Sequence, residues 1–371
     1  MRTAAVVIGA LLVVVVLLDT FETVILPRQV KRRVRLTTIL FALTWRPYRR
    51  FARSLRNDSW RDSVLAYFGP STILLLLVAW AIGIIGGFAL IHWGLGSHIM
   101  EASGQKGLGE DAYLSGTTFF TLGLGDVVPV SGAERAVAVL EAGLGLGFLA
   151  IVIAYIPVLY QSFSHREVFV NRLDILAGAP PTPGVILKRF SSYGTDALRG
   201  LLEDWQHWTA ELMDSTQSYP VLAFYRSQHG DQSWLTALVA ILDTCALIGC
   251  DPGTDFADNR DSAELAFSLA SHAARDVCDV LGGRVREGLV ERSEGTHHDH
   301  LLGWLHNRGL DMDEANQAAR SLDRLREHYE PQVAAMSDAL LIDLPAFCPE
   351  CEPAPHHHAP RSNGEPAPHH H

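Results

Sequence analysis

The residues best suited to chemistry form one short run, Thr121-Leu122-Gly123-Leu124-Gly125-Asp126. Glycine tolerates the positive φ angles that other residues avoid, so alternating glycines let successive carbonyl oxygens turn toward one line. Stacked rings of such oxygens replace the hydration shell of a cation such as K⁺, and the Thr121 hydroxyl would add one more ring. Asp126 closes the run on its outer, wet side. The run predicts a site that coordinates a dehydrated cation through backbone oxygens.

Long uncharged stretches surround this run. Residues 63–100 and 142–165 contain no Asp, Glu, Lys or Arg, and residues 3–18 near the amino terminus contain none either. Crossing a hydrocarbon core of ~30 Å takes ~20 apolar residues in a helix. We therefore predict three membrane-spanning helices, at about Thr3–Leu26, Leu65–Trp93 and Arg135–Tyr160.

A cleaved signal peptide is the alternative for the first of these segments, since its charged start is only Arg2. No small-X-small cleavage site follows it, however, and the next residues are strongly basic, which favours a retained helix. Asp19 and Glu22 lie three residues apart on one face of this helix. They either dock on basic groups of the following loop, line a vestibule, or reach the membrane interface.

The segment Asp111–Phe120 precedes the glycine-rich run and is too short to span a bilayer. It is predicted to re-enter the membrane as a short pore helix, with Glu110 and Asp111 favourable at its amino terminus. Irregular backbone at membrane depth is tolerated only when protein buries it or when it lines a water-filled path. Tyr113 and Thr117 share one face of the predicted helix, and either hydroxyl could hold Asp126 from behind.

Three glycines, Gly143, Gly145 and Gly147, lie within the third spanning segment. They permit close packing against the pore helix, or bending of the inner helix. Pro157 predicts a kink near its inner end, because proline removes a helical hydrogen bond. Glycine flexure with a proline kink would make a gate, and packing glycines with a tolerated proline are the alternative. We expect Glu141 to pair with protein, with Arg135 as a candidate.

The basic residues concentrate in one linker. Residues 27–66 hold eleven Lys and Arg against Asp58 and Asp62. The positive-inside rule places this linker in the cytoplasm, the amino terminus outside, and the region after the third helix inside. Tyr48, Phe51, Ala52 and Leu55 fall at helical spacing, which predicts an interfacial helix that binds anionic lipid over residues 28–56. Nucleic acid is the alternative partner, disfavoured because the linker lies between two spanning segments.

Residues 65–160 resemble the two-helix-plus-pore-loop module of prokaryotic potassium channels, preceded by an extra amino-terminal helix. Thr121, Gly123, Gly125 and Asp126 match the family's Thr-Val-Gly-Tyr-Gly-Asp filter, and Leu122 is conservative at the Val position. Leu124 replaces the usual Tyr or Phe, and Phe120 replaces the usual Thr or Ser. Strictly K⁺-selective and more broadly cation-permeable pores are both compatible with these departures. The resemblance implies a homotetramer, because one chain supplies one filter strand.

The remainder of the chain is acidic. From His165 onward it carries 31 Asp and Glu against 16 Lys and Arg, which leaves a net charge of +4 for residues 1–164. Apolar residues at helical spacing, such as Leu235, Leu238, Val239 and Leu242, predict an α-helical cytoplasmic domain. It lacks the glycine-rich turn of nucleotide-binding regulatory domains, and the nature of its regulator is not evident. The five cysteines are expected to be reduced.

Two metal-like clusters occur late in the chain. Cys348 and Cys351 have zinc-ligand spacing, but no second Cys-X-X-Cys follows, and His297-His298-Asp299-His300 lies on a predicted turn. Neither makes a strong metal site. No Ser/His/Asp arrangement or His-Glu-X-X-His motif indicates an enzyme, and no cofactor is expected beyond K⁺ as the permeant ion.

The chain is thus predicted to be an all-α membrane protein with three transmembrane helices, a re-entrant pore helix and filter, and an α-helical cytoplasmic domain. Its predicted function is a tetrameric K⁺-permeable channel of the cell membrane. A channel-derived sensor or scaffold that conducts little and acts through its carboxy-terminal domain is the alternative. The expected segments are 1–27, the first helix; 28–64, the basic linker; 65–163, the pore domain; 164–352, the helical domain; and 353–371, a disordered Pro/His-rich tail.

Overall fold

The structure is a computed structural model that describes residues 1–24, 36–96, 99–101, 107–177, 181–227, 233–250, 256–283, 285, 292, 312–345 and 347. The chain forms two compact units, the first made of Met1–His165 with Leu212–Arg226 and the second of the remaining residues. Helices predominate, and three of those described are long and apolar enough to cross a membrane. The predicted fold class, with three spanning helices and a helical carboxy-terminal region, is confirmed.

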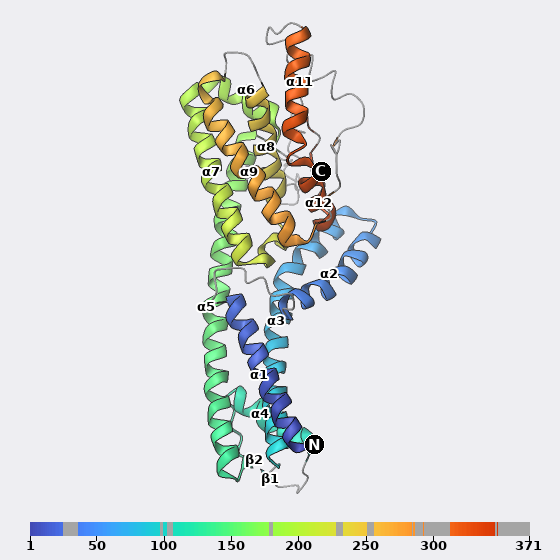
Figure 1. The fold of residues 1–371 in the computed structure, drawn as a ribbon, viewed down its shortest axis with the longest axis vertical. Helices are drawn as coiled ribbons and strands as arrows, with labels where there is room; N and C mark the ends of the chain where they lie inside the picture. The colour runs from blue at the N-terminus through green and yellow to red at the C-terminus, as the bar shows by residue number, and fades with distance from the viewer. Residues whose placement is uncertain are drawn as a thin grey trace, which may run out of the picture. The chain divides into compact units, whose positions relative to one another are not determined.

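The first unit is built from helices and one small ribbon (Figure 1). Its elements are α1 (Arg2–Val24), α2 (Leu36–Ser54), α3 (Asp58–Leu95), β1 (Ile99–Glu101), α4 (Leu108–Phe119), β2 (Val127–Pro129), the first part of α5 (Gly132–Ala177), and the 3-10 turn η1 (Pro220–Phe224). β1 pairs antiparallel with β2, with Met100 opposite Val128. The sequence did not predict this ribbon, which joins the two ends of the pore loop.

Glycines let α1 pack closely along α3. A Cβ atom on Gly87 would lie 2.6 Å from a methyl group of Val13, and one on Gly83 would lie 2.8 Å from Val16. On α1, a Cβ on Gly9 would come 2.4 Å from the Gly87 carbonyl oxygen. Small residues spaced four apart allow such approach in membranes, where packing rather than water exclusion holds helices together. The Gly83-X-X-X-Gly87 spacing signals this contact in the sequence.

A buried carboxylate joins the carboxy-terminal end of α1 to its neighbours. Asp19 accepts hydrogen bonds from the Trp80 indole N–H on α3 and from the Thr37 hydroxyl on α2, each at 2.9 Å. The Thr23 and Thr37 hydroxyls also lie 3.1 Å apart. A carboxylate inside a membrane protein is costly unless protein groups solvate it. Asp19 therefore lies against protein, and it fixes the start of α2 at the end of α1.

Replacing Asp19 with Leu should destabilise the folded protein by about 1–3 kcal/mol, because the Trp80 and Thr37 donors would be left without this acceptor. Unfolding in a denaturing-detergent titration measures the change. Leu18→Ala, on the exposed side of the same turn, serves as the control and should have a smaller effect. Equal losses in the two variants would contradict a stabilising role for the Asp19 carboxylate.

The spanning helices continue beyond their predicted ends. α3 begins at Asp58 and α5 ends at Ala177, so their 38 and 46 residues exceed the predicted segments, mainly at the start of α3 and the end of α5. At 1.5 Å per residue they are about 57 Å and 69 Å long, about twice the thickness of a hydrocarbon core. The helical assignment runs through Pro70 and Pro157, so neither proline ends its helix. Hydropathy marks the apolar part of a helix, not where the helix stops.

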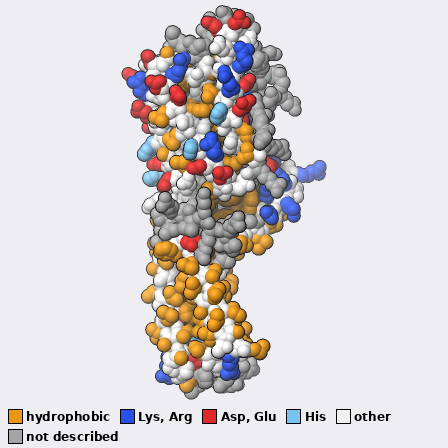
Figure 2. Space-filling model, in the orientation of Figure 1, with side chains coloured by type: hydrophobic (Ala, Val, Ile, Leu, Met, Phe, Trp, Pro, Cys, Tyr) orange, Lys and Arg blue, Asp and Glu red, His pale blue; other side chains and the backbone are white. Residues whose placement is uncertain are grey.

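The second unit is a helical bundle around one apolar helix. Its elements are the end of α5, α6 (Pro183–Tyr193), most of α7 (Thr195–Ser218), α8 (Trp234–Cys250), η2 (Ala257–Asn259), α9 (Arg260–Leu281), α11 (Met312–Arg326) and α12 (Glu330–Leu340). Nearly every residue of α8 is buried, and α6, α9, α11 and α12 pack against it. Figure 2 shows many acidic and basic side chains on this unit and mainly apolar ones over α1, α3 and α5.

An ion cluster lies inside this bundle. The Arg292 guanidinium donates to Asp243 at 2.6 Å and to Glu330 at 2.7 Å, and Arg326 donates to the same Glu330 oxygen at 2.9 Å. Burial by itself disfavours the charged guanidinium, but the two carboxylates outweigh it and raise the pKa of Arg292. Burial and the nearby Asp243 carboxylate raise the pKa of Tyr329, whose hydroxyl donates to Asp243. Two arginines and two carboxylates leave the cluster without net charge.

Candidate functional site

The pore helix α4 positions the site. It runs from Leu108 to Phe119, close to the predicted Asp111–Phe120, and Glu110 and Asp111 lie in its first turn. Leu114, Ser115 and Phe119 are buried against the rest of the unit. The last turn tightens, since the Thr121 N–H donates to the Thr118 carbonyl at 3.0 Å. The glycine-rich run leaves α4 directly from this turn.

The backbone of the run alternates in handedness. φ is +56° at Thr121, +54° at Gly123 and +80° at Gly125, whereas Leu122 and Leu124 do not have positive φ. The Leu122 and Gly123 N–H groups both donate to the Thr117 carbonyl, at 2.7 and 3.4 Å. Alternating left- and right-handed residues gather successive N–H groups on one side of the chain. Here the N–H groups of Leu122 and Gly123 face α4.

The five residues predicted to bind ions lie together in this alternating segment. Thr121, Leu122, Gly123, Leu124 and Gly125 are all solvent-exposed in the single chain. Thr121 adopts the left-handed conformation without being glycine, which is uncommon and costs energy. Strained backbone of this kind is concentrated at functional sites. The geometry suits cation coordination by backbone oxygens.

Asp126 is held by Tyr113. The Tyr113 hydroxyl donates to Asp126 Oδ2 at 2.8 Å. Thr117, the other residue proposed for this contact, instead donates its hydroxyl to the Leu114 carbonyl at 3.0 Å. The Thr117 alternative was therefore wrong, because a threonine inside a helix reaches the carbonyl one turn back. Its backbone carbonyl supports the run instead.

Tyr113→Phe should weaken the outer end of the site, because Asp126 loses a hydrogen bond while the ring and its packing stay. We expect currents that open normally and then decline at least several-fold faster under sustained voltage. Patch recording of reconstituted protein measures this. The control is Tyr67→Phe, which removes an exposed hydroxyl on α3. Steady currents in Tyr113→Phe equal to those of the unaltered protein would argue against the brace.

Gly145 is the residue at which α5 approaches the end of α4 most closely among the three glycines. A Cβ atom at Gly145 would lie 2.1 Å from the Phe119 carbonyl oxygen, whereas Gly143 and Gly147 have nothing within 4 Å. Phe119 also packs on the Phe148 ring, with centroids 5.5 Å apart. Of the three glycines predicted to allow packing or bending, only Gly145 makes a close contact in this chain. A hinge role for the glycines and for Pro157 stays a prediction.

Gly145→Ala should therefore displace the end of α4 and reduce ion flux at least tenfold, since the obstructing atom is backbone. Gly147→Ala is the matched control, two residues along the same helix with open space around it, and it should leave flux within about twofold. Flux into vesicles, normalised to incorporated protein, measures both. Similar losses in the two variants would instead indicate that helix flexibility matters.

An apolar cavity of about 250 Å³ lies where α3, α4 and α5 meet. Its lining includes Leu77, Ala81, Phe119, Phe120, Leu146 and Val152. Thr121 contributes the one polar side chain among the described residues that line it. Such a wall offers no ligands to a metal or a charged cofactor. The Thr121 hydroxyl and the backbone are the polar groups at this end of the run.

Glu141 pairs with His92, which the sequence analysis did not foresee. The Glu141 carboxylate on α5 lies 3.5 Å from His92 Nε2 on α3, and both side chains are completely buried. Arg135, the partner considered earlier, donates its Nε to the Pro129 carbonyl instead. His92 lies near the end of α3 and is buried in protein. A buried carboxylate in a membrane protein is costly unless a protein group lies against it, and His92 is the group that lies nearest to Glu141 across the helix contact.

No group of three metal-binding side chains occurs among the residues that the structure describes. The candidate ligands Cys348 and Cys351, the His297–His300 cluster and the part of the basic linker before Leu36 lie outside those residues. Cys245, Cys250 and Cys278 are buried free thiols. Burial raises the pKa of the Cys245 and Cys278 thiols, which makes them poor nucleophiles.

The fold and the site together define an ion-channel pore module. Two spanning helices enclose a short re-entrant helix and an alternating-φ loop, and residues 72–161 match the family model described as "Ion channel". The match covers α3 from Thr72, the whole pore loop, and α5 through Gln161. The resemblance inferred from the glycine-rich run is confirmed, and the extra apolar amino-terminal helix is present as α1.

A relative is similar beyond the pore module. The uncharacterized membrane protein YdjJ of Bacillus subtilis (strain 168) is 24% identical over 215 residues, which is 57% of this chain. The chain spans about three fifths of the length of that protein (60%). No solved structure matches the chain. Residues 72–161 are thus similar to ion-channel proteins, and the relative is described as a membrane protein.

Proposed function

We propose that the chain forms a homotetrameric, K⁺-permeable channel that conducts through the carbonyl oxygens of residues 121–125. The observation that supports this most directly is the alternating φ at Thr121, Gly123 and Gly125, with the Leu122 and Gly123 N–H groups turned toward α4. Carbonyl oxygens turned the other way can replace water around a dehydrated cation. A match to the ion-channel family over residues 72–161 supports the same function.

The tetramer follows from the coordination that a dehydrated ion requires. A single chain offers oxygens on one side only, and a cyclic assembly of four would supply the rest. The apolar side chains of Leu122 and Leu124 are exposed in one chain and would be covered by neighbouring copies. The carboxy-terminal end of α4, which carries partial negative charge, would point toward the inner vestibule and favour a cation there.

The proposed orientation places the amino terminus outside and the second unit in the cytoplasm of the cell. The basic α2, between the first two spanning helices, belongs inside by the positive-inside rule. An odd number of crossings then puts the two termini on opposite sides. In this orientation the ribbon of β1 and β2 and the outer end of the filter face the exterior. The second unit would regulate opening or assembly from within.

The test is ion flux through reconstituted vesicles. Gly123→Ala should abolish K⁺ flux and leave the tetramer intact, because alanine at φ +54° costs about 1–2 kcal/mol and changes the direction of a filter carbonyl. Gly116→Ala, on the pore helix with open space around it, is the matched control and should conduct. The reversal potential in a K⁺/Na⁺ gradient gives the selectivity that Leu124 allows.

Flux by Gly123→Ala equal to that of the unaltered protein would remove this segment from the ion path. A tetramer that conducts neither K⁺ nor Na⁺ would favour the alternative of a membrane sensor or scaffold. Tetramer content is measured separately, by cross-linking in the membrane, so that loss of assembly is not mistaken for loss of conduction.

A further inference from the structure

The helix α2 has two faces with different surroundings. On one face Phe41, Trp45 and Tyr48 pack on Phe68 of α3 and Phe224 of η1, with the Trp45 and Phe68 ring centroids 4.5 Å apart. Tyr48 also donates its hydroxyl to the Val64 carbonyl. This face fixes the helix to the first unit. The face of α2 that points away from these rings is exposed, and its composition is unusual.

Exposed apolar residues recur every fourth position along that outer face. Ile39 is 49% exposed, Leu43 69% and Phe51 56%, and Pro47 is exposed between them. The exposed arginines Arg46, Arg50 and Arg53 follow one edge of this line. We call these seven residues the outer α2 face. α2 contains no acidic residue of its own, so the face combines an apolar stripe with exposed positive charge.

Hydrogen bonds of α1 and α2 place this face near a membrane boundary. The Thr37 hydroxyl, at the start of α2, bonds to Asp19 near the end of α1. α1 has 23 residues and is about 34 Å long, which matches one crossing of the hydrocarbon core. Figure 1 shows α2 projecting sideways from the α1–α3 pair. A helix that leaves a spanning helix sideways at its end lies near the headgroups.

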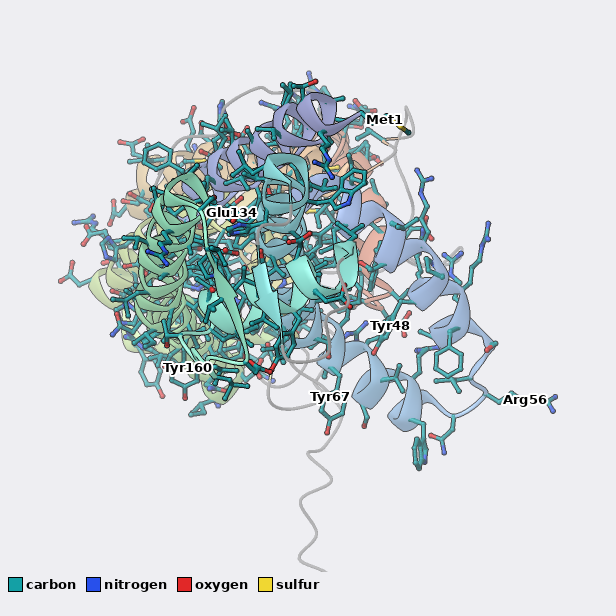
Figure 3. The ribbon with its side chains drawn as sticks, turned by 90° about the horizontal axis from the view of Figure 1, so that it is seen from below. Met1, Tyr48, Arg56, Tyr67, Glu134 and Tyr160 are labelled. Carbon is teal, nitrogen blue, oxygen red and sulfur yellow. The ribbon has the colours of Figure 1, made fainter. Side chains whose placement is uncertain are left out.

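Basic and aromatic side chains are also exposed just after the end of α2. Figure 3 shows Arg56 extending away from the tip of this projection, and Trp60, in the first turn of α3, is 68% exposed. Figure 2 shows basic side chains gathered on the same projection. Tryptophan favours the headgroup region of a bilayer, and arginine binds phosphate groups. Aromatic and basic side chains together are typical of a surface that contacts lipid headgroups.

We propose that the outer α2 face binds the anionic lipids of the inner leaflet, with Leu43 and Phe51 inserted among the acyl chains and Arg46 and Arg50 on the phosphates. Charge complementarity selects this partner, because an anionic leaflet attracts each nearby arginine. The apolar stripe enters the boundary between headgroups and acyl chains, as in other amphipathic interfacial helices. This binding is independent of conduction, so it can hold whether or not the pore passes K⁺.

The test reports the environment of position 51. An environment-sensitive fluorophore is attached at Phe51→Cys in the full-length chain, in which Cys348 and Cys351 are replaced by Ser. The same background with Phe51 retained takes no label. The protein is reconstituted in phosphatidylcholine vesicles with increasing phosphatidylglycerol. We expect a blue shift of the emission that grows with the anionic fraction and is lost in 1 M salt, where the Debye length falls to about 3 Å.

The matched variants distinguish an effect of the α2 arginines from an effect of the net charge of the whole protein. Arg46→Gln with Arg50→Gln should abolish the part of the shift that depends on phosphatidylglycerol. Arg275→Gln with Arg320→Gln removes the same charge from exposed sites of the second unit and should leave the shift unchanged. Loss in both double variants would mean that net charge, and not the outer α2 face, determines the response, which would overturn the proposal.

Other occupants give different results. A blue shift that is independent of phosphatidylglycerol, with fluorophore self-quenching that falls on dilution with unlabelled chain, would show a second copy on this face. A shift that is already complete in detergent would show a protein partner within the same molecule. The absence of any shift would show a face that stays in water. Each of these three results overturns the proposal, and each can be measured in a variant that does not conduct.

Discussion

The pore loop depends on one constraint, which is that backbone N–H groups at membrane depth must have partners. Bilayers supply no water to a turn that leaves a helix inside the hydrocarbon layer. The Thr117 carbonyl meets this need by accepting from both Leu122 and Gly123. Both N–H groups are therefore bound on the side of α4. The turn that leaves the pore helix has protein partners for these two donors.

Tight packing around α4 supports that arrangement. Gly145 brings α5 against the Phe119 carbonyl, and Gly83 and Gly87 bring α1 against α3. The buried His92–Glu141 pair adds a polar link between α3 and α5. Helices that are held through small residues and paired polar groups form a rigid frame. A rigid frame keeps the backbone of residues 121–125 in its strained conformation.

The sequence predicted those parts of the fold that depend on local composition. Uncharged stretches located all three spanning helices, and the short segment before Thr121 identified the pore helix to within three residues of its start. The glycine spacing indicated a channel pore module, and residues 72–161 match the ion-channel family model. Helical spacing in Leu235–Leu242 predicted α8. These features could be predicted because each depends on residues that are close together in the sequence.

Features that depend on distant residues were not predictable in the same way. The partner of Glu141 is 49 residues away on another helix, and a nearby arginine was the more obvious candidate from the sequence alone. The ribbon of β1 and β2 pairs segments on either side of the pore loop, and neither strand has more than three residues to signal it. Thr117 and Tyr113 share a helix face, and only their side-chain reach decided which of them meets Asp126.

The hydrogen bond between Asp19 and Trp80 has a consequence for how the chain is inserted into the membrane during synthesis. Ribosomes complete α1 first, and 61 residues separate the carboxylate from the indole that it needs. Until α3 emerges, the Asp19 carboxylate at the end of α1 lacks the indole N–H that binds it in the folded chain. Placing an unpartnered carboxylate in hydrocarbon is costly, so we expect the end of α1 to stay in contact with water at the translocation machinery until then. Integration of α1 and α3 into the bilayer therefore becomes a joint event. In truncated chains that end before Trp80, α1 should be less stably inserted in the bilayer.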